Sequence, residues 1–290
     1  GDRSVPSYFG SHPPAANLGE VEVKGYEVEM RINKVLPNDL RLWANMSMTH
    51  AKNEIIKTEE PQLLPDYQKD AGYSIGQSTS WVDAGFVNTY DELYATTPHD
   101  TNDESKLVGD YKIIDFNGDG VIDSKDQVPY GYPGSPQNTY NATTGFEWKG
   151  FSAFVQFYGV NNVTRYVPLN SFGSQLNTVY DLGSWWSKEN PDADMVVPRW
   201  LSTPSYHSGT QFLFDGSYLR LKNAEIAYTF EDNGWINGIG FNSLRVFLNG
   251  NNLWVWSDMP DDRESNFAGA GGQGAYPMMR RYNFGVKITL

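Results

Sequence analysis

Apolar and polar side chains alternate along several segments of this chain, in runs longer than an ordinary strand. The C-terminal segment is the clearest: Tyr282, Phe284, Val286, Ile288 and Leu290 alternate with Arg281, Asn283, Gly285, Lys287 and Thr289. Successive side chains of a strand point to opposite faces of its sheet, so each segment predicts a strand with one apolar and one polar face. The pattern predicts seven long strands, at 19–34, 38–54, 143–149, 150–160, 216–231, 242–257 and 279–290, and a shorter hairpin near 75–87.

The connections between these strands alternate between short and long. Short connections follow the first, third and fifth strands, at 33–39, 149–150 and 231–241. Long connections follow the second, fourth and sixth strands, at 55–142, 161–215 and 258–278. In an up-and-down sheet, alternate connections lie at opposite ends, so one end carries tight turns and the other carries long loops. Outer-membrane barrels have this asymmetry, with short periplasmic turns and long extracellular loops.

Alternation alone leaves two all-β interpretations open. In a soluble β-sandwich the apolar face is buried and the charged face is solvated. In a membrane barrel the apolar face meets lipid, and the polar face lines a hydrated lumen. Strand length and aromatic side chains on the apolar faces favour the barrel; these aromatics include Tyr26, Tyr228, Phe230 and Tyr282. The lumen would then be lined by charged residues such as Glu27, Glu29, Arg31, Glu225 and Lys287.

Composition narrows the possible functions. The chain of 290 residues has 35 acidic and 22 basic side chains, a net charge of −13, which argues against a nucleic-acid partner. It has no cysteine, so disulfides, zinc–thiolate sites and thiol catalysis are excluded. No apolar run reaches the roughly 18 residues of a transmembrane helix. Aromatic residues make up 14% of the chain and, with few helical patterns, favour an all-β fold.

The segment 115–126 has the spacing of a calcium-binding loop. Its predicted ligands are the side chains of Asp115, Asn117 and Asp119, the carbonyl of Val121, Asp123 through a water, and Asp126. Gly120 supplies the sharp turn at the sixth position. The twelfth position is Asp, whose arm is shorter than that of the usual Glu. We expect a structural calcium that fastens a long loop. The alternatives are a direct role in substrate binding, or a solvated acidic turn without metal.

Three tryptophans of the second long connection, Trp185, Trp186 and Trp200, are candidates for contact with substrate or with a lid protein. The alternative is internal packing of a compact loop. An acidic cluster of Asp258, Asp261, Asp262 and Glu264 is interpreted as a solvated turn, since a flexible loop gives paired carboxylates no fixed separation for glycosidase chemistry. The four histidines, His12, His50, His99 and His207, have no metal-ligand spacing. No catalytic triad or phosphate loop is evident, so we expect no enzyme.

Several motifs occur in order along the chain. After the loop at 115–123 come Tyr132-Pro-Gly, the segment GFEWKGF at 145–151, GSYLRLKN at 216–223, LRVFLNGNNL at 244–253 and a final stretch from Tyr276-Pro to Val286. The opening segment NLGEVEVKGYE at 17–27 is similar to a barrel strand of TonB-dependent receptors. From about residue 15 to its end, the chain resembles the C-terminal part of SusC-like (RagA/SusC family) TonB-dependent transporters, nutrient importers of Bacteroidota outer membranes.

The resemblance implies a barrel of about 22 strands, an N-terminal plug with a TonB box and a SusD-like lipoprotein lid. Plug signals are absent here, and seven strands cannot close such a barrel, so we expect the remaining strands from elsewhere. The implied function is import of oligosaccharides or peptides across the outer membrane, driven by TonB–ExbB–ExbD. The rival hypotheses are a secreted soluble β-sandwich that binds carbohydrate and has a structural calcium, and a surface enzyme using the acidic cluster.

Overall fold

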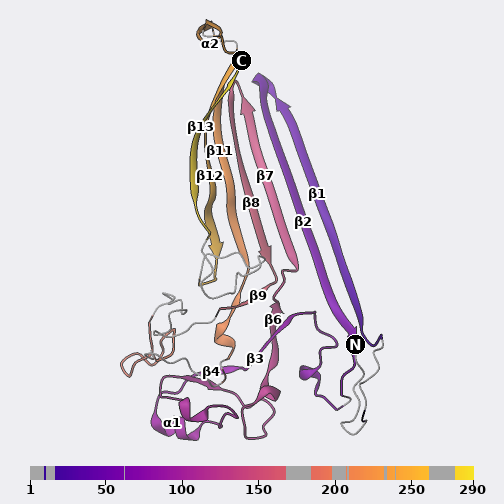
Figure 1. The fold of residues 1–290 in the computed structure, drawn as a ribbon, viewed down its shortest axis with the longest axis vertical. Helices are drawn as coiled ribbons and strands as arrows, with labels where there is room; N and C mark the ends of the chain where they lie inside the picture. The colour runs from indigo at the N-terminus through magenta and orange to yellow at the C-terminus, as the bar shows by residue number, and fades with distance from the viewer. Residues whose placement is uncertain are drawn as a thin grey trace.

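The computed structural model describes residues 10, 17–61, 63–167, 184–197, 207, 209–231, 234–238, 240–260 and 278–290. Its main feature is one antiparallel sheet of seven long strands, in the order β1-β2-β7-β8-β11-β12-β13 (Figure 1). The strands are β1 (Glu20–Leu36), β2 (Leu40–Lys57), β7 (Asn138–Trp148), β8 (Phe151–Asn161), β11 (Tyr218–Glu231), β12 (Ser243–Ser257) and β13 (Arg281–Thr289). The seven strands predicted from alternation are confirmed, and we call this sheet the wall.

The short and long connections lie at opposite ends of the wall (Figure 1). The short ones hold the 3-10 helix η2 (Pro37–Asp39), the turn at Lys149 and Gly150, and the helix α2 (Gly234–Gly238). The long ones span 58–137, 162–217 and 258–280. The third strand begins at Asn138 rather than 143, because its first residues pair with β2 and β8 although few of them are apolar.

The apolar face of the wall is exposed along its length. Val28, Met30, Tyr282 and Phe284 keep 54%, 46%, 71% and 73% of their surface accessible. Within the described part of the chain, no second sheet or helical layer covers these side chains. A soluble β-sandwich would bury them against each other. The wall therefore has the architecture of a barrel section, with an apolar outer face and a polar inner face.

The polar face is joined across strands by side-chain hydrogen bonds. An amide chain crosses four strands: Asn251 donates to Asn223, Asn223 donates to Gln156 over 2.5 Å, and Gln156 donates to Asn141 over 3.1 Å. Each of these groups occupies the polar side of its strand in the register of the sheet. The polar side chains of this inner face therefore satisfy one another without ligand or solvent. The apolar side chains of the opposite face make no such hydrogen bonds.

Two ion pairs lie on the same polar face. The Arg245 guanidinium is 2.6 Å from the Glu225 carboxylate, and the Arg41 guanidinium is 3.3 Å from the carboxylate of Glu147. Each pair joins neighbouring strands, β12 with β11 and β2 with β7. Of the charges expected to line a lumen, Glu225 is thus neutralised by a neighbouring strand, and Arg31 pairs with Glu29 of its own strand over 3.4 Å. In the described residues, no helix is long and apolar enough to cross a membrane.

A β-bulge at Lys222 resets the side-chain alternation of β11. Leu221 pairs with Phe157 of β8, whereas Asn223 pairs with the next residue of that strand, Gln156, so Lys222 is left over. Without this extra residue, every side chain beyond it would change faces. With it, Leu219 and Leu221 stay on the apolar face, and the Lys222 ammonium lies over the ring of Tyr158 on the polar face.

The long connections fold together at one end of the wall, and we call this part the loop layer. It contains β3 (Gln77–Ser80), β4 (Asp83–Phe86), α1 (Tyr90–Ala95), β5 (Tyr111–Ile113), β6 (Val128–Pro133), β9 (Thr164–Tyr166) and β10 (Leu213–Asp215), with 3-10 helices η3 (Asp66–Gln68), η4 (Asp103–Ser105), η5 (Ser124–Asp126) and η6 (Thr210–Phe212). The hairpin predicted near 75–87 is wrong. β3 pairs with β6 and β4 pairs with β5, so both pairings are long-range.

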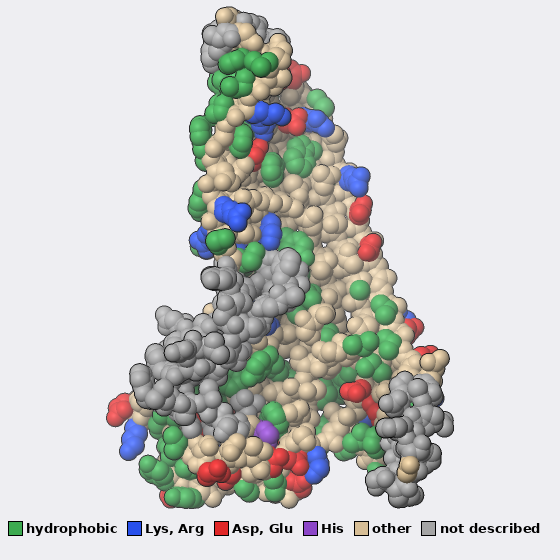
Figure 2. Space-filling view, viewed as in Figure 1, with side chains coloured by type: hydrophobic (Ala, Val, Ile, Leu, Met, Phe, Trp, Pro, Cys, Tyr) green, Lys and Arg blue, Asp and Glu red, His purple; other side chains and the backbone are tan. Residues whose placement is uncertain are grey.

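The loop layer has a hydrophobic core of its own. Seven buried residues form it: Tyr111, Ile113, Ile122, Val167, Met195, Val196 and Phe212. They come from the first two long connections. Ile122, inside the predicted calcium loop, is completely buried. Figure 2 shows acidic and hydrophobic side chains side by side over the outer end of this layer, around α1. The predicted metal loop is therefore part of a packed unit.

Candidate functional site

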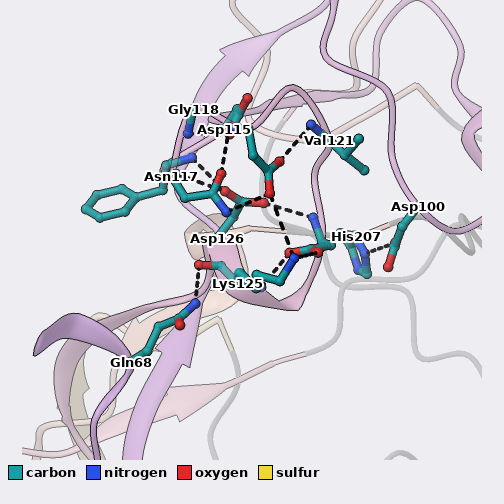
Figure 3. A network of polar contacts seen from close by, with 12 residues as sticks. Gln68, Asp100, Asp115, Asn117, Gly118, Val121, Lys125, Asp126 and His207 are labelled. Atoms are coloured by element: carbon teal, nitrogen blue, oxygen red, sulfur yellow. Dashed lines mark hydrogen bonds and ion pairs between the residues drawn. The ribbon is translucent and has the colours of Figure 1, made fainter. Parts of the chain in front are cut away.

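The segment 115–126 forms a tight loop between β5 and β6, and its first carboxylate bends the backbone around itself (Figure 3). Asp115 Oδ1 accepts a hydrogen bond from the backbone N–H of Gly118, and Oδ2 accepts one from Gly120, both at 2.8 Å. Gly118 and Gly120 have φ of 73° and 90°, values that glycine adopts without strain. The turn predicted at Gly120 is present.

The middle of the loop repeats this pattern with shorter steps. Asn117 Oδ1 accepts from the backbone of Asp119 at 2.8 Å, and Asp119 Oδ1 accepts from the backbone of Val121 at 3.1 Å. The Asn117 side-chain amide also donates to Asp119 Oδ2 at 3.0 Å. The oxygen-bearing side chains of Asp115, Asn117 and Asp119 are therefore all held against the backbone of the turn, and Figure 3 shows Asp115 and Asn117 beside each other.

Asp126 closes the loop from its far end. It is fully buried, and its Oδ1 accepts from the backbone N–H groups of Phe116 and Asn117, at 2.8 and 3.2 Å. Its Oδ2 accepts from the backbone N–H of Asp123 at 2.8 Å. A buried carboxylate with three N–H donors is compensated without a counter-cation. Asp126 thus ties the beginning of the loop to its end.

Asp123 caps the short helix η5 that ends the loop. Its Oδ1 accepts from the backbone N–H of Lys125 at 2.7 Å, and its Oδ2 is 3.0 Å from the Lys125 ammonium. These two contacts, the backbone hydrogen bond first, hold the pKa of Asp123 below its usual range. The carboxylate is therefore ionised at neutral pH, as a metal ligand must be.

The donor set is all oxygen, which suits calcium rather than a softer metal. The described residues, however, contain no group of three His, Cys, Asp or Glu side chains arranged to hold an ion. The carboxylates of Asp115, Asp119 and Asp126 accept backbone hydrogen bonds instead. The residue types therefore fit calcium, while the loop is closed by its own hydrogen bonds.

Backbone pairing and one indole fasten the loop to the rest of the loop layer. The N–H of Ile122 donates to Pro98 and its carbonyl accepts from Asp100, at 2.8 and 3.0 Å. The indole N–H of Trp81 donates to the carbonyl of Asp123 at 2.7 Å. Together with the burial of Ile122, these contacts couple the loop to two distant segments.

Two histidines lie beside this junction, and sequence reasoning missed them as a pair. His207 stacks on Trp81, with ring centroids 4.1 Å apart, and its Nε2 is 2.7 Å from Asp100 Oδ1 (Figure 3). Its ring is 5.6 Å from that of buried His99. Burial, and then the nearby Lys106 ammonium, lower the pKa of His99 to about 4. His99 and His207 come from different connections, so no spacing in the sequence could pair them.

The structure describes two of the three candidate tryptophans, Trp185 and Trp186. Trp186 is buried, and its indole N–H donates to Asn88 Oδ1 at 2.8 Å. Trp185 packs against the core of the loop layer. Internal packing, the alternative weighed from the sequence, therefore describes both residues. Trp200 lies outside the described residues, as do Asp261, Asp262 and Glu264 of the acidic cluster, while Asp258 is exposed.

The wall defines a class of protein, the large antiparallel transmembrane β-barrel. The predicted resemblance to the C-terminal part of SusC-like TonB-dependent transporters is confirmed by known proteins. TonB-dependent receptor P3 of Formosa agariphila is 24% identical over 313 aligned residues, covering 99% of the chain and 30% of the relative. TonB-dependent receptor SusC of Bacteroides thetaiotaomicron is 24% identical over 225 residues, covering 74% of the chain and 21% of SusC.

The fold is also found in solved structures. The RagAB peptide importer in its "open-open" state matches with a TM-score of 0.67 and 19% identity, over 100% of this chain and 31% of that one. No family model matches the sequence. The chain spans about 30% of the length of curated relatives such as TonB-dependent receptor P3. The all-β barrel section and the outer-membrane localisation predicted from the sequence are confirmed.

Proposed function

We propose that this chain is part of the barrel of a TonB-dependent importer that takes up oligosaccharides or peptides. One observation carries the proposal: a polar, cross-linked face and an apolar face that no other described element covers belong to the same seven strands. Such a sheet is stable only where one side meets hydrocarbon and the other a hydrated lumen. Further strands would complete the barrel beyond the edges of β1 and β13.

Two aromatic groups on the apolar face support a membrane setting. Trp254 and Trp256, about half exposed, lie near the loop layer, and Phe151 and Tyr228 pair near the tight turns, with ring centroids 4.5 Å apart. Aromatic side chains gather at both interfaces of a bilayer. The loop layer then faces the cell exterior, and the tight turns face the periplasm.

The proposed partners are a SusD-like surface lipoprotein over the loop layer, and TonB–ExbB–ExbD acting on a plug outside this chain. The relatives are named receptors, and the solved neighbours are called peptide transporters or importers. Transport needs binding and passage rather than covalent chemistry, so we propose no enzymatic activity. The acidic cluster that suggested an enzyme includes Asp258, which is exposed.

Uptake tests the transport proposal directly. Deleting the encoding gene should abolish energised uptake of a labelled oligosaccharide or peptide, and a protonophore should have the same effect on the wild type. Complementation with the full-length gene should restore uptake, whereas a gene lacking 281–289 should not. Unchanged uptake of both cargo classes would contradict the proposal, and a full-length protein that stays folded and monomeric without detergent would favour a soluble binding module.

We further propose that the loop at 115–126 binds one structural calcium. Support comes from its all-oxygen donors and from the side chains of Asp115, Asn117 and Asp119, which are all held against the backbone of the same turn. The carbonyl of Val121 and a water on Asp123 would complete the shell, with Asp126 binding through Oδ2, which accepts a single N–H.

Chelation tests the calcium proposal. Removing calcium from the full-length protein should lower the protease resistance of residues 100–130, and Asp115→Ala should do the same in the presence of calcium. Glu104→Ala is the control, since this exposed carboxylate lies outside the loop. Equal protease resistance with and without chelator would show that the hydrogen bonds of the loop suffice on their own.

A further inference from the structure

A polar cavity of about 680 Å³ lies between the end of β2 and the exit of the 115–126 loop. Its walls come from three segments: 64–70, 73–79 and 124–129. Ligand sites of small molecules typically have volumes of about 300–1,000 Å³. The cavity is separate from the polar face of the wall and from the hydrophobic core of the loop layer, so neither of these explains it.

The first side of the cavity, 64–70, is fixed to the 115–126 loop at one point. The phenol of Tyr67 and the side-chain amide of Gln68 both donate to the backbone carbonyl of Lys125, at 3.0 and 2.6 Å (Figure 3 shows Gln68 and Lys125). Tyr67 also packs edge-on against Phe116, with ring centroids 4.8 Å apart. This side of the cavity is therefore coupled to the 115–126 loop.

The second side of the cavity, 73–79, is fixed to strand β2 of the sheet. Ile55 of β2 exchanges backbone hydrogen bonds with Gly72 and Tyr73, each at 2.8 Å. Asn53 accepts from the Ser74 hydroxyl at 2.7 Å and, through its side chain, from the backbone of Ile75 at 2.6 Å. The cavity is thus pre-formed, because both sides are held by hydrogen bonds that involve none of the groups left over to bind a ligand.

The groups left over are neutral, apart from the carboxylate of Asp70, which also lines the cavity and adds a hydrogen-bond acceptor. The amide of Gln127, the phenol of Tyr73 and the hydroxyls of Thr79 and Ser124 line the cavity and make no side-chain hydrogen bond with any described residue. The two lysines of the lining are already paired: Lys69 with Asp66 at 2.6 Å, and Lys125 with Asp123 at 3.0 Å. No unpaired cation lines the described cavity, which disfavours an anionic ligand.

We infer that this cavity binds a short neutral saccharide at the outer rim of the barrel. Hydroxyl groups both donate and accept, and so do the amide, phenol and hydroxyls that remain free here. Tyr67 and Tyr73 also line the cavity, and their aromatic rings supply the apolar surface that a sugar ring needs. The inference deepens the proposed function, on which it rests for the class of ligand, by naming a capture site outside the lumen.

Because Tyr67 and Gln68 hold the carbonyl of Lys125, an occupied cavity also stabilises the exit of the 115–126 loop. The saccharide should therefore slow amide hydrogen exchange in two places, at 64–79 and at 122–129. A sugar held only in the lumen would leave these two segments unchanged.

The test is hydrogen-exchange mass spectrometry of the full-length protein in detergent. The probes are a pool of neutral di- to tetrasaccharides and, separately, a pool of uncharged short peptides. We expect the saccharides to slow exchange at 64–79 and 122–129. Gln127→Ala and Tyr73→Phe should each weaken the apparent affinity by about three- to tenfold, the size expected for losing one or two neutral hydrogen bonds. Gln137→Ala, outside the lining, is the control and should match the wild type.

Three results would overturn the inference: no slowing with saccharides, slowing with peptides instead, or equal slowing in the wild type and in both cavity variants. Each is distinct from failure of the proposed function, which is measured by uptake. A transporter that imports sugar while this cavity stays empty would keep its function and lose only this site.

Discussion

The wall and the loop layer are stabilised in opposite ways. In the wall, even central strands leave both faces partly exposed, and β1 is exposed along almost its whole length. In the loop layer, Ile122 and Val167 are completely buried in a compact core. The wall depends on two different surroundings, while the loop layer folds around its own interior as a soluble domain does. Substitutions or changes of pH that destabilise one region should therefore leave the other folded.

Deleting Lys222 should have the largest effect, and it should act on the wall. Without the bulge, Leu219 and Leu221 would turn to the polar face and Arg220 to the apolar face. Arg220 lies near the loop layer, where a charge that faces lipid costs only about 0–1 kcal/mol, so the main loss is the register with both neighbouring strands. We expect no folded barrel, measured as loss of the heat-modifiable band on electrophoresis. Lys222→Ala keeps the extra residue and should assemble; assembly of the deletion would contradict the role of the bulge.

Ile122→Ala should come next, and it should act on the loop layer alone. Truncating a fully buried isoleucine costs about 2–5 kcal/mol. We expect rapid proteolysis between 62 and 137 while the barrel band is retained. Val121→Ala, one position earlier and 39% exposed, is the matched control. Equal resistance of the two variants would show that the core of the loop layer contributes little.

Acid should loosen the loop layer before the wall. The folded state lowers the pKa of His99 from 6.5 to about 4, so it holds the neutral imidazole. This contribution is complete above pH 6.5 and is lost progressively as the pH falls toward 4, by at most about 3 kcal/mol. Proteolysis of 62–137 should therefore accelerate over this range, less so in His99→Gln. A wild-type proteolysis rate that does not change between pH 6.5 and 4 would contradict this role of His99.

Asn223→Ala should have the smallest effect. Asn223 links Gln156 to Asn251 in the amide chain, but the polar face is hydrated, so each lost bond costs only about 0.5–1.5 kcal/mol. We expect a small drop in the denaturation midpoint of the barrel and no change in the loop layer, with Thr229→Ala as the control on the same strand. A large drop would mean that the amide chain holds the wall together.

The alternation of apolar and polar residues predicted the wall, because the two faces of each strand meet different surroundings and successive side chains point to opposite faces. It missed the start of β7, where Asn138 and Asn141 contribute side-chain hydrogen bonds rather than apolar surface. It also missed the Lys222 bulge, although the apolar positions change parity there, from Leu219 and Leu221 to Ala224 and Ile226. The loop layer was less readable. The spacing of 115–126 predicted a turn at Gly120, but the pairing of β3 with β6, and of His99 with His207, is set by contacts between distant segments.

The composition of the loop-layer core has a consequence for the order of folding. Ile122 comes from the connection before the β7–β8 hairpin, and Val167, Met195 and Phe212 come from the connection after it. Neither connection holds the whole core, so the hairpin must have brought both to the same side of the membrane before the core closes. We therefore expect closure of the loop-layer core to be a late kinetic step, limited by assembly of the strands beneath it.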